Sequence, residues 1–341
     1  MIARRLSVAA VVTLAGTAVL FGVAAPPENC PPITADQTHA AAMLATDWIV
    51  DNQQPDGRWL YEYDRERDRD SLDYNEVRHA GVMTSLYQAA ARGHEGALAS
   101  ADTGLEWAEE HLVVRDEWIG MTDSRSISLG TNALMVAALA ERREFTGDTQ
   151  HDDLMRGLAQ LIADQTEPSG ALLAYYDLGP DQPRPDTYSI YYTGEAQWAL
   201  SRMHHNFPDE GWDDPADRML HYMATVRDDV EDIWPPLADH WSGYGLGSTA
   251  AYPDRPAGTP LTDAELDMVL RQGGLIGQRV RSIAQRFGPW GVLVRGTFTP
   301  RGGGYGVFGE GLTGLWRASL LDERLAPERN DLADRAVCIT G

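Results

Sequence analysis

The hydrophobic and polar positions alternate between two kinds of helical segment from Asp36 onward. In the first kind, apolar residues recur three and four positions apart and charged residues fill the other positions, as in residues 98–112 and 149–165. A turn containing Gly or Pro follows, and then a segment nearly free of charge beyond its first turn. Amphipathic segments are typical of helices with one solvated face, whereas uniformly apolar or small segments are typical of buried helices. The sequence therefore predicts outer and inner helices in alternation.

Five segments have the inner character, and they recur at intervals of about 50 to 66 residues. A repeat of this length indicates stacked supersecondary units. We predict an all-α protein, an α/α toroid with five hairpins and a closing helix or an incomplete ring of six. The inner segments begin near Asp73, Ser126, Tyr188, Asp239 and Tyr305. The outer segments cover residues 36–54, 98–112, 149–165, 213–228 and 262–286, and a last outer-type segment begins near Glu328.

The N-terminal 30 residues have a different pattern from the rest of the chain. Arg4 and Arg5 precede an apolar run from Leu6 to Ala25 that has small residues near its end, which is typical of a secretory signal peptide. The run is also near the ~20 residues needed to cross a bilayer, so an N-terminal membrane anchor is the alternative. We expect residues 1–30 to direct export, giving a protein that is secreted or anchored outside the cytoplasm. Residues 31–341 lack a disordered linker and are expected to form one domain.

The composition excludes one class of partner. The net charge of −23 arises from 51 acidic residues against 28 basic ones, all of them arginine. Proteins that bind nucleic acids neutralise phosphates with clustered cations, so this acid excess argues against a nucleic-acid partner.

Two cysteines, Cys30 and Cys338, lie near opposite ends of the chain. An oxidising compartment permits a bridge between them, and ring closure would bring the first and last helices together. We predict a disulfide that closes the ring. Two unrelated thiols are the alternative.

Several short sequences, including DYNEVRHAG, YYTGEA, DHW and GEGL, accompany this hairpin pattern. Together they resemble the α/α-toroid proteins of the six-hairpin glycosidase-like group, over nearly the whole chain after residue 30. That group includes glycoside hydrolases, uronyl hydrolases, polysaccharide lyases and sugar epimerases. The resemblance implies the architecture and does not select one reaction.

Parallel inner helices place their N-termini at one end of a toroid, so the polar residues there are expected to share a pocket. Glycoside hydrolysis needs an acid that protonates the leaving oxygen and a second carboxylate. Aromatic rings stack on sugars, and arginine holds a uronate carboxylate through two hydrogen bonds. We predict catalytic carboxylates among Glu195, Glu310, Asp73 and Asp239. The predicted substrate-binding residues are Asn75, Arg78, His79, Arg125, Asn132, Tyr191, Tyr192, His240, Trp241 and Tyr305.

These residues also have structural interpretations, since the aspartates can cap helices and His79 or the aromatic residues can pack in the core. Zinc-dependent prenyltransferase-like and terpene-cyclase-like sites would need an inner-helix cysteine or an acidic run at an inner mouth, and the sequence has neither. We therefore predict no metal site and no cofactor. The preferred interpretation is an exported glycan hydrolase. The alternatives are a uronate lyase or C5-epimerase, a non-catalytic glycan-binding or assembly module, and an isoprenoid-handling toroid.

Overall fold

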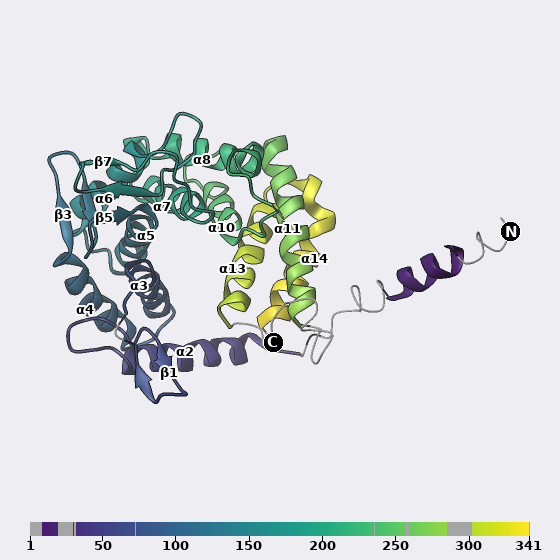
Figure 1. Cartoon of the computed structure of the whole chain (residues 1–341), viewed down its shortest axis with the longest axis horizontal. Coiled ribbons are helices and arrows are strands. Elements are labelled where there is room, and N and C mark those ends of the chain that lie inside the picture. Colours follow the sequence, from purple (N-terminus) through teal and green to yellow (C-terminus); the bar gives the residue numbers. More distant parts are fainter. Residues whose placement is uncertain are drawn as a thin grey trace.

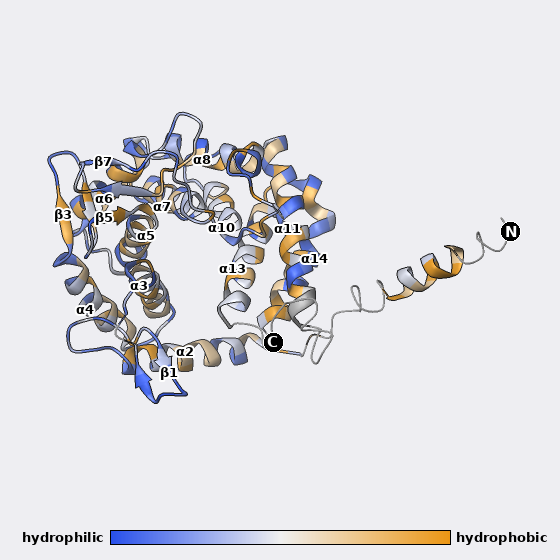
Figure 2. Cartoon of the chain, viewed as in Figure 1, coloured by the Kyte–Doolittle hydropathy of each residue, from blue (hydrophilic) through white to orange (hydrophobic). Residues whose placement is uncertain are grey.

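The computed structural model describes residues 9–19, 30, 32–71, 73–234, 236–256, 259–284 and 302–340. Residues 9–19 form a helix, coloured mainly as hydrophobic in Figure 2. No helix within the described ranges is both long and apolar enough to cross a membrane. The other residues of the predicted signal or anchor, 1–8 and 20–29, lie outside the described residues.

Helices of alternating position build an open ring (Figure 1). Each inner helix packs on the next one along the chain, and the outer helices pack behind them and return the chain to the next inner helix. The inner helices are α3 (Glu76–Ala91), α5 (Leu129–Thr146), α7 (Tyr192–Asn206), α10 (His240–Thr249) and α13 (Gly302–Ser319). The outer helices are α4 (Ala97–Glu109), α6 (Asp152–Asp164), α8 (Asp213–Thr225), α11 (Asp263–Ala284) and α14 (Ala326–Thr340).

The hydrophobic pattern explains why α5 is inside and α6 is outside. Every residue of α5 from Leu129 to Ala140 is buried, on all sides of the helix. In α6 the buried residues, such as Met155, Leu158 and Ile162, recur at helical spacing while its acidic residues remain more exposed. Burying apolar area stabilises by about 25 cal/mol per Å², so each helix turns its apolar surface toward the ring.

Short strands lie in the connections between helices. They are β1 (Tyr63–Asp64), β2 (Arg69–Asp70), β3 (Leu112–Val114), β4 (Ile119–Met121), β5 (Ser126–Ser128), β6 (Tyr175–Asp177) and β7 (Gln182–Pro183). All pairs are antiparallel, and β5, β6 and β7 form a three-stranded sheet in which Ile127 faces Tyr176. The short helix α9 (Arg227–Val230) and the 3₁₀ turns Pro208–Glu210 and Glu323–Leu325 complete the described elements.

Glycines allow α10 and α13 to approach each other closely. A Cβ on Gly243 would lie 2.6 Å from the carbonyl oxygen of Gly311, and one on Gly314 would collide with the backbone of Gly243. Side chains larger than hydrogen at these positions would therefore force the two helices apart. This contact sets the position of α13, which carries Glu310.

Helix α2 (Ala35–Asp51) differs from its prediction as an outer helix. It packs on α3 and α4, and it lies across the side of the ring between α3 and α13 (Figure 1). One face of α2 meets α3 and α4, whereas the apolar side chains of Leu44 and Trp48 are exposed. Next to it, a disulfide joins Cys30 to Cys338 of α14, with 4.8 Å between the Cα atoms.

Candidate active site

A cavity of about 940 Å³ lies inside the ring. All five inner helices line it, together with α2 and the last turns of α14. Most of the side chains from α3, α5 and α7 belong to the second halves of these helices, among them Gln88, Glu141 and Arg202, whereas α13 contributes along nearly its whole length. The cavity volume lies within the ~300–1,000 Å³ usual for small-molecule sites.

Glu310 and Tyr244 form the acid–phenol pair of this cavity. Glu310 is exposed to the cavity, and the hydroxyl of Tyr244 lies close enough to its carboxyl group to favour the ionised form. Loss of bulk water around the carboxyl raises the pKa of Glu310, an effect that this hydroxyl partly offsets. Burial, followed by the charges of Glu310 and Glu141, raises the pKa of Tyr244. Glu310 is thus an acid that stays protonated to higher pH than an exposed glutamate.

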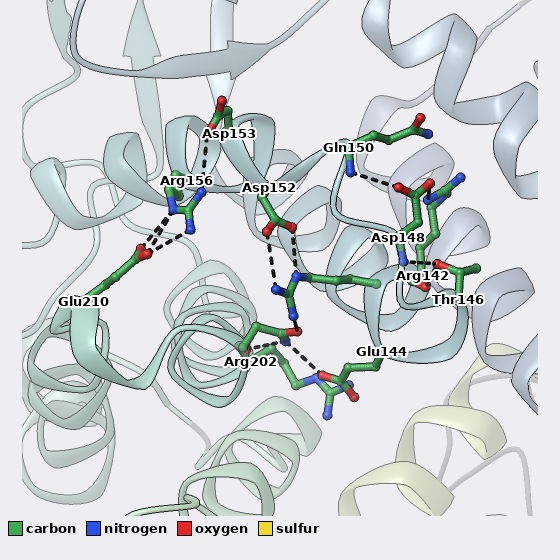
Figure 3. Close-up of polar contacts among 12 residues, drawn as sticks. Arg142, Glu144, Thr146, Asp148, Gln150, Asp152, Asp153, Arg156, Arg202 and Glu210 are labelled. Atoms are coloured by element: carbon green, nitrogen blue, oxygen red, sulfur yellow. Dashed lines mark hydrogen bonds and ion pairs between the residues drawn. The ribbon is translucent and has the colours of Figure 1, made fainter.

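A second carboxylate, Glu141, faces the same cavity from α5. Its Oε1 atom lies 3.3 Å from Nη2 of Arg202 and accepts a hydrogen bond of 3.2 Å from Gln88. The same guanidinium nitrogen donates to Glu144 at 2.6 Å, a contact drawn in Figure 3. A cation and an amide donor stabilise the ionised form of a carboxyl group. Glu141 and Glu310 therefore have opposite environments within one cavity.

His205 and Trp198 add a base and an aromatic surface. The Nε2 atom of His205 lies 3.0 Å from the carbonyl oxygen of Ser248, so Nε2 carries the hydrogen and Nδ1 is left as the acceptor. Burial lowers the pKa of His205, which favours the neutral ring. Trp198 lines the cavity with its ring edge-on to Tyr244 at 5.0 Å.

Solved structures share this arrangement of helices. A cellobiose 2-epimerase from Spirochaeta thermophila DSM 6192 matches with a TM-score of 0.59 and 16% identity, over 90% of this chain and 86% of that one. A D-mannose isomerase matches with a TM-score of 0.52 and 14% identity, over 65% of this chain and 66% of that one. The match thus spans just under two thirds of the isomerase. No family model and no curated protein matches the sequence.

The fold is an α/α toroid. The predicted fold class is therefore confirmed, as is the architectural resemblance to toroid proteins. Of the predicted site residues, the toroid places Glu310 and Tyr305 at the central cavity.

Glu195 does not line the cavity with Glu310. Its side chain is 5% exposed, and its Oε2 atom packs so closely on Gly130 that a Cβ there would collide with it. That oxygen has no hydrogen-bond partner among the described residues. Burial, reinforced by the charge of Asp239, raises the pKa of Glu195 to about 8. The expectation that both glutamates share one mouth is wrong because Glu195 is sealed between the starts of α5 and α7.

Asp239 has a structural role instead of the predicted catalytic one. Its Oδ1 atom accepts hydrogen bonds from the backbone N–H groups of Trp241 and Ser242, which caps α10. Its Oδ2 atom accepts a bond of 2.5 Å from Nη1 of Arg227. The side chain is fully buried, so a substrate cannot reach it.

His79 and Asn132 are core residues, which corrects their predicted substrate-binding roles. The ring nitrogens of His79 contact the hydroxyl of Tyr74 at 2.7 Å and the carbonyl oxygen of Gly104 at 2.9 Å, and burial lowers its pKa to about 4. Asn132 accepts from the N–H of Met121 and donates to the carbonyl oxygens of Ile119 and Leu158. Both side chains use their polar atoms to hold neighbouring elements.

The polar residues predicted at the starts of the first two inner helices do not line the cavity. Asp73 and Arg125 are exposed, and Arg78 is exposed with its guanidinium over the ring of Tyr61 at 5.0 Å. Asn75 caps α3 by accepting from the N–H of Arg78. None of these four predicted residues is part of the cavity lining.

The aromatic residues predicted at the starts of α7 and α10 pack against one another. Tyr191 lies beside His240, Tyr192 lies beside Tyr175, and Trp241 stacks on the far side of Trp198 at 5.7 Å. Burial raises the pKa of Tyr192 to about 12 and lowers that of His240 to about 4. None of these rings lines the cavity itself.

Sequence reasoning missed most of the cavity residues. Glu141, Arg202 and His205 lie in the second halves of their helices, whereas the prediction took the N-terminal ends as the site. A usable signal was present in α7, because Trp198, Arg202 and His205 follow at spacings of four and three residues and thus share one face.

Proposed function

We propose that this chain is a carbohydrate-active enzyme that hydrolyses glycosidic bonds in the central cavity. The observation that carries the proposal is the pair Glu310 and Glu141, two carboxyl groups on one cavity, of which Glu310 is desolvated and Glu141 is paired with Arg202. Glycoside hydrolysis needs this difference, since one group must donate a proton while the other acts as an anion.

Glu310 is assigned as the general acid. Its raised pKa favours the protonated form, and exposure to the cavity lets it reach the oxygen of the leaving sugar. Glu141 is assigned as the carboxylate that activates water or attacks the anomeric carbon, with Arg202 and Gln88 holding its orientation. Tyr305 supplies aromatic surface against which the apolar face of a sugar can stack, and the buried Trp198 forms part of the cavity wall.

Isomerisation or epimerisation is the second candidate, favoured by His205. A neutral imidazole whose Nε2 is held by the Ser248 carbonyl oxygen has its Nδ1 atom ready to accept a proton from carbon. Proteins named as a cellobiose 2-epimerase and a D-mannose isomerase share the fold with TM-scores above 0.5. In this reaction Glu310 would return the proton, with no bond between sugars broken.

Export is part of the proposal. The Cys30–Cys338 disulfide is of the kind that persists in oxidising compartments, and the apolar pattern before Cys30 is typical of a secretory segment. Whether the segment is removed or anchors the protein is decided by N-terminal sequencing of the mature protein from its native host.

A product analysis tests the reaction. The purified protein is incubated with neutral and uronate-containing oligosaccharides in deuterated water, and the products are analysed for new reducing ends, unsaturated sugars and deuterium on carbon. New reducing ends that disappear in Glu310→Gln support hydrolysis. Deuterium at carbon that disappears in His205→Gln supports the second candidate, and unchanged sugars throughout would reject both.

A further inference from the structure

Three arginines line the central cavity, and two of them lack a carboxylate partner in the described part of the chain. Arg202 is paired with Glu141 and Glu144. Arg92 is exposed and donates to the backbone carbonyl oxygen of Gln88, with no ion pair. Arg317 is exposed and forms no ion pair with any described residue.

The local charge at the cavity differs from that of the whole chain. Three arginines face three glutamates there, whereas the chain as a whole has 28 arginines and 51 acidic residues. Because the raised pKa of Glu310 favours its neutral form, the balance in the cavity shifts further toward positive charge. The cavity is thus a site that an anion can enter despite the strongly negative protein.

The position of Arg317 connects this charge to the proposed chemistry. It lies two helical turns after Glu310 on α13, with Thr313 between them, and all three line the cavity. Its positive charge also acts on Tyr244, the phenol beside Glu310. An anionic group held by Arg317 would therefore lie on the same face of α13 as the proposed acid.

We infer that the substrate is an acidic glycan, in which a sugar carboxylate is bound by Arg317 and Arg92. A guanidinium donates two parallel hydrogen bonds to a carboxylate, which fixes the orientation of the sugar ring as well as its charge. A carboxylate is favoured over a phosphate ester, because the greater negative charge of phosphate would be repelled by Glu141 and Glu144. This inference rests on the proposed function, whose site it shares.

Matched ligands test the inference. Oligomers of galacturonate, glucuronate and mannuronate are compared with the same oligomers after chemical reduction of their carboxyl groups to alcohols, and with sulfated neutral oligomers. Binding is measured by calorimetry to wild type, Arg317→Gln, Arg92→Gln and Arg78→Gln. Arg78 is the matched control because it is an exposed arginine outside the cavity.

The expected result is that one uronate oligomer binds to wild type roughly 10- to 100-fold more tightly than its reduced form, as for a charge-assisted hydrogen bond. Arg317→Gln should remove this preference, Arg92→Gln should weaken it, and Arg78→Gln should leave it unchanged. Equal binding of the reduced or sulfated oligomers, an unchanged preference in Arg317→Gln, or no binding by any uronate oligomer would overturn the inference. Uronate binding without any product would support the inference while rejecting the proposed function.

Discussion

Arg227 and Asp239 form an ion pair of 2.5 Å in which both side chains are buried. The pair joins α9 to the first turn of α10, where Asp239 is also the helix cap. Removing one partner of a buried pair leaves an uncompensated charge, which costs about 3–5 kcal/mol. We therefore expect Asp239→Asn to lower the free energy of unfolding by about that much in urea titrations. Its turnover per folded molecule should stay near that of wild type; a stable but inactive Asp239→Asn protein would restore the catalytic role.

Glu195→Gln is expected to stabilise the protein above pH 5. The folded-state pKa of about 8 exceeds the ordinary value of 4.5 for a glutamate in an unfolded chain, so the native state holds a proton that the unfolded chain releases. Wild-type stability is then highest below pH 4.5 and falls until about pH 8, by on the order of 3 kcal/mol at pH 7. The glutamine variant should lose this pH dependence in denaturant titrations at pH 4, 6 and 8. A wild-type stability that rises over this range would contradict the raised pKa.

Tyr244→Phe should move the pH dependence of activity upward. The hydroxyl stabilises the ionised form of Glu310, so its removal raises the pKa of the acid further. Because a general acid works when protonated, the falling limb of kcat/KM should shift to higher pH. Tyr305→Phe is the control, since Tyr305 lines the same cavity but is not bonded to Glu310. A limb that stays in place or moves to lower pH would remove Glu310 from the acid role.

The double variant Cys30→Ser/Cys338→Ser is expected to be less stable. It should also bind its substrate more weakly, because residues just after Cys30 and the last turns of α14 line the cavity. The disulfide closes a loop with a sequence separation of 308 residues, and the loop-entropy description assigns such a link up to about 5 kcal/mol. Thermal unfolding with and without reductant measures the first effect, and ligand titration measures the second. Mass spectrometry of unreduced peptides shows whether the protein recovered from its native host carries the bond. Free thiols at both positions would reject it.

The repeat of inner and outer helices was predictable because burial imposes a periodic pattern that a sequence displays directly. Helix α2 was harder, since an amphipathic helix that spans a gap in the ring has the same pattern as an outer one. Glu310 was found because it is the one acidic residue of α13. Glu141 was missed because adjacent residues of α5 are also charged. Only the helix phase decides that Arg142 turns to Asp102 and Asp148 while Glu141 faces the cavity.

Side-chain function at the helix starts was not predictable for a related reason. His79 and Asn132 have the residue types of a binding site, but the Tyr74 hydroxyl and the Gly104 carbonyl oxygen occupy the ring nitrogens of His79, and backbone groups of β4 and α6 occupy the amide of Asn132. The sequence shows which polar residues belong to the inner helices. Whether their side chains are free to bind a substrate depends on hydrogen bonds to elements that are distant in the sequence.

The wall that α2 and α14 add to the cavity has a consequence for biosynthesis. Residues just after Cys30 and residues around Cys338 both line the cavity. This part of the cavity wall therefore forms only when α2 and α14 are both in place. Helices α3 to α10 can pack without α14, because each inner helix packs on the next one along the chain. The substrate-binding wall is then the last part of the toroid to be assembled, and a chain that ends before α14 would keep most of its core yet lack an enclosed site.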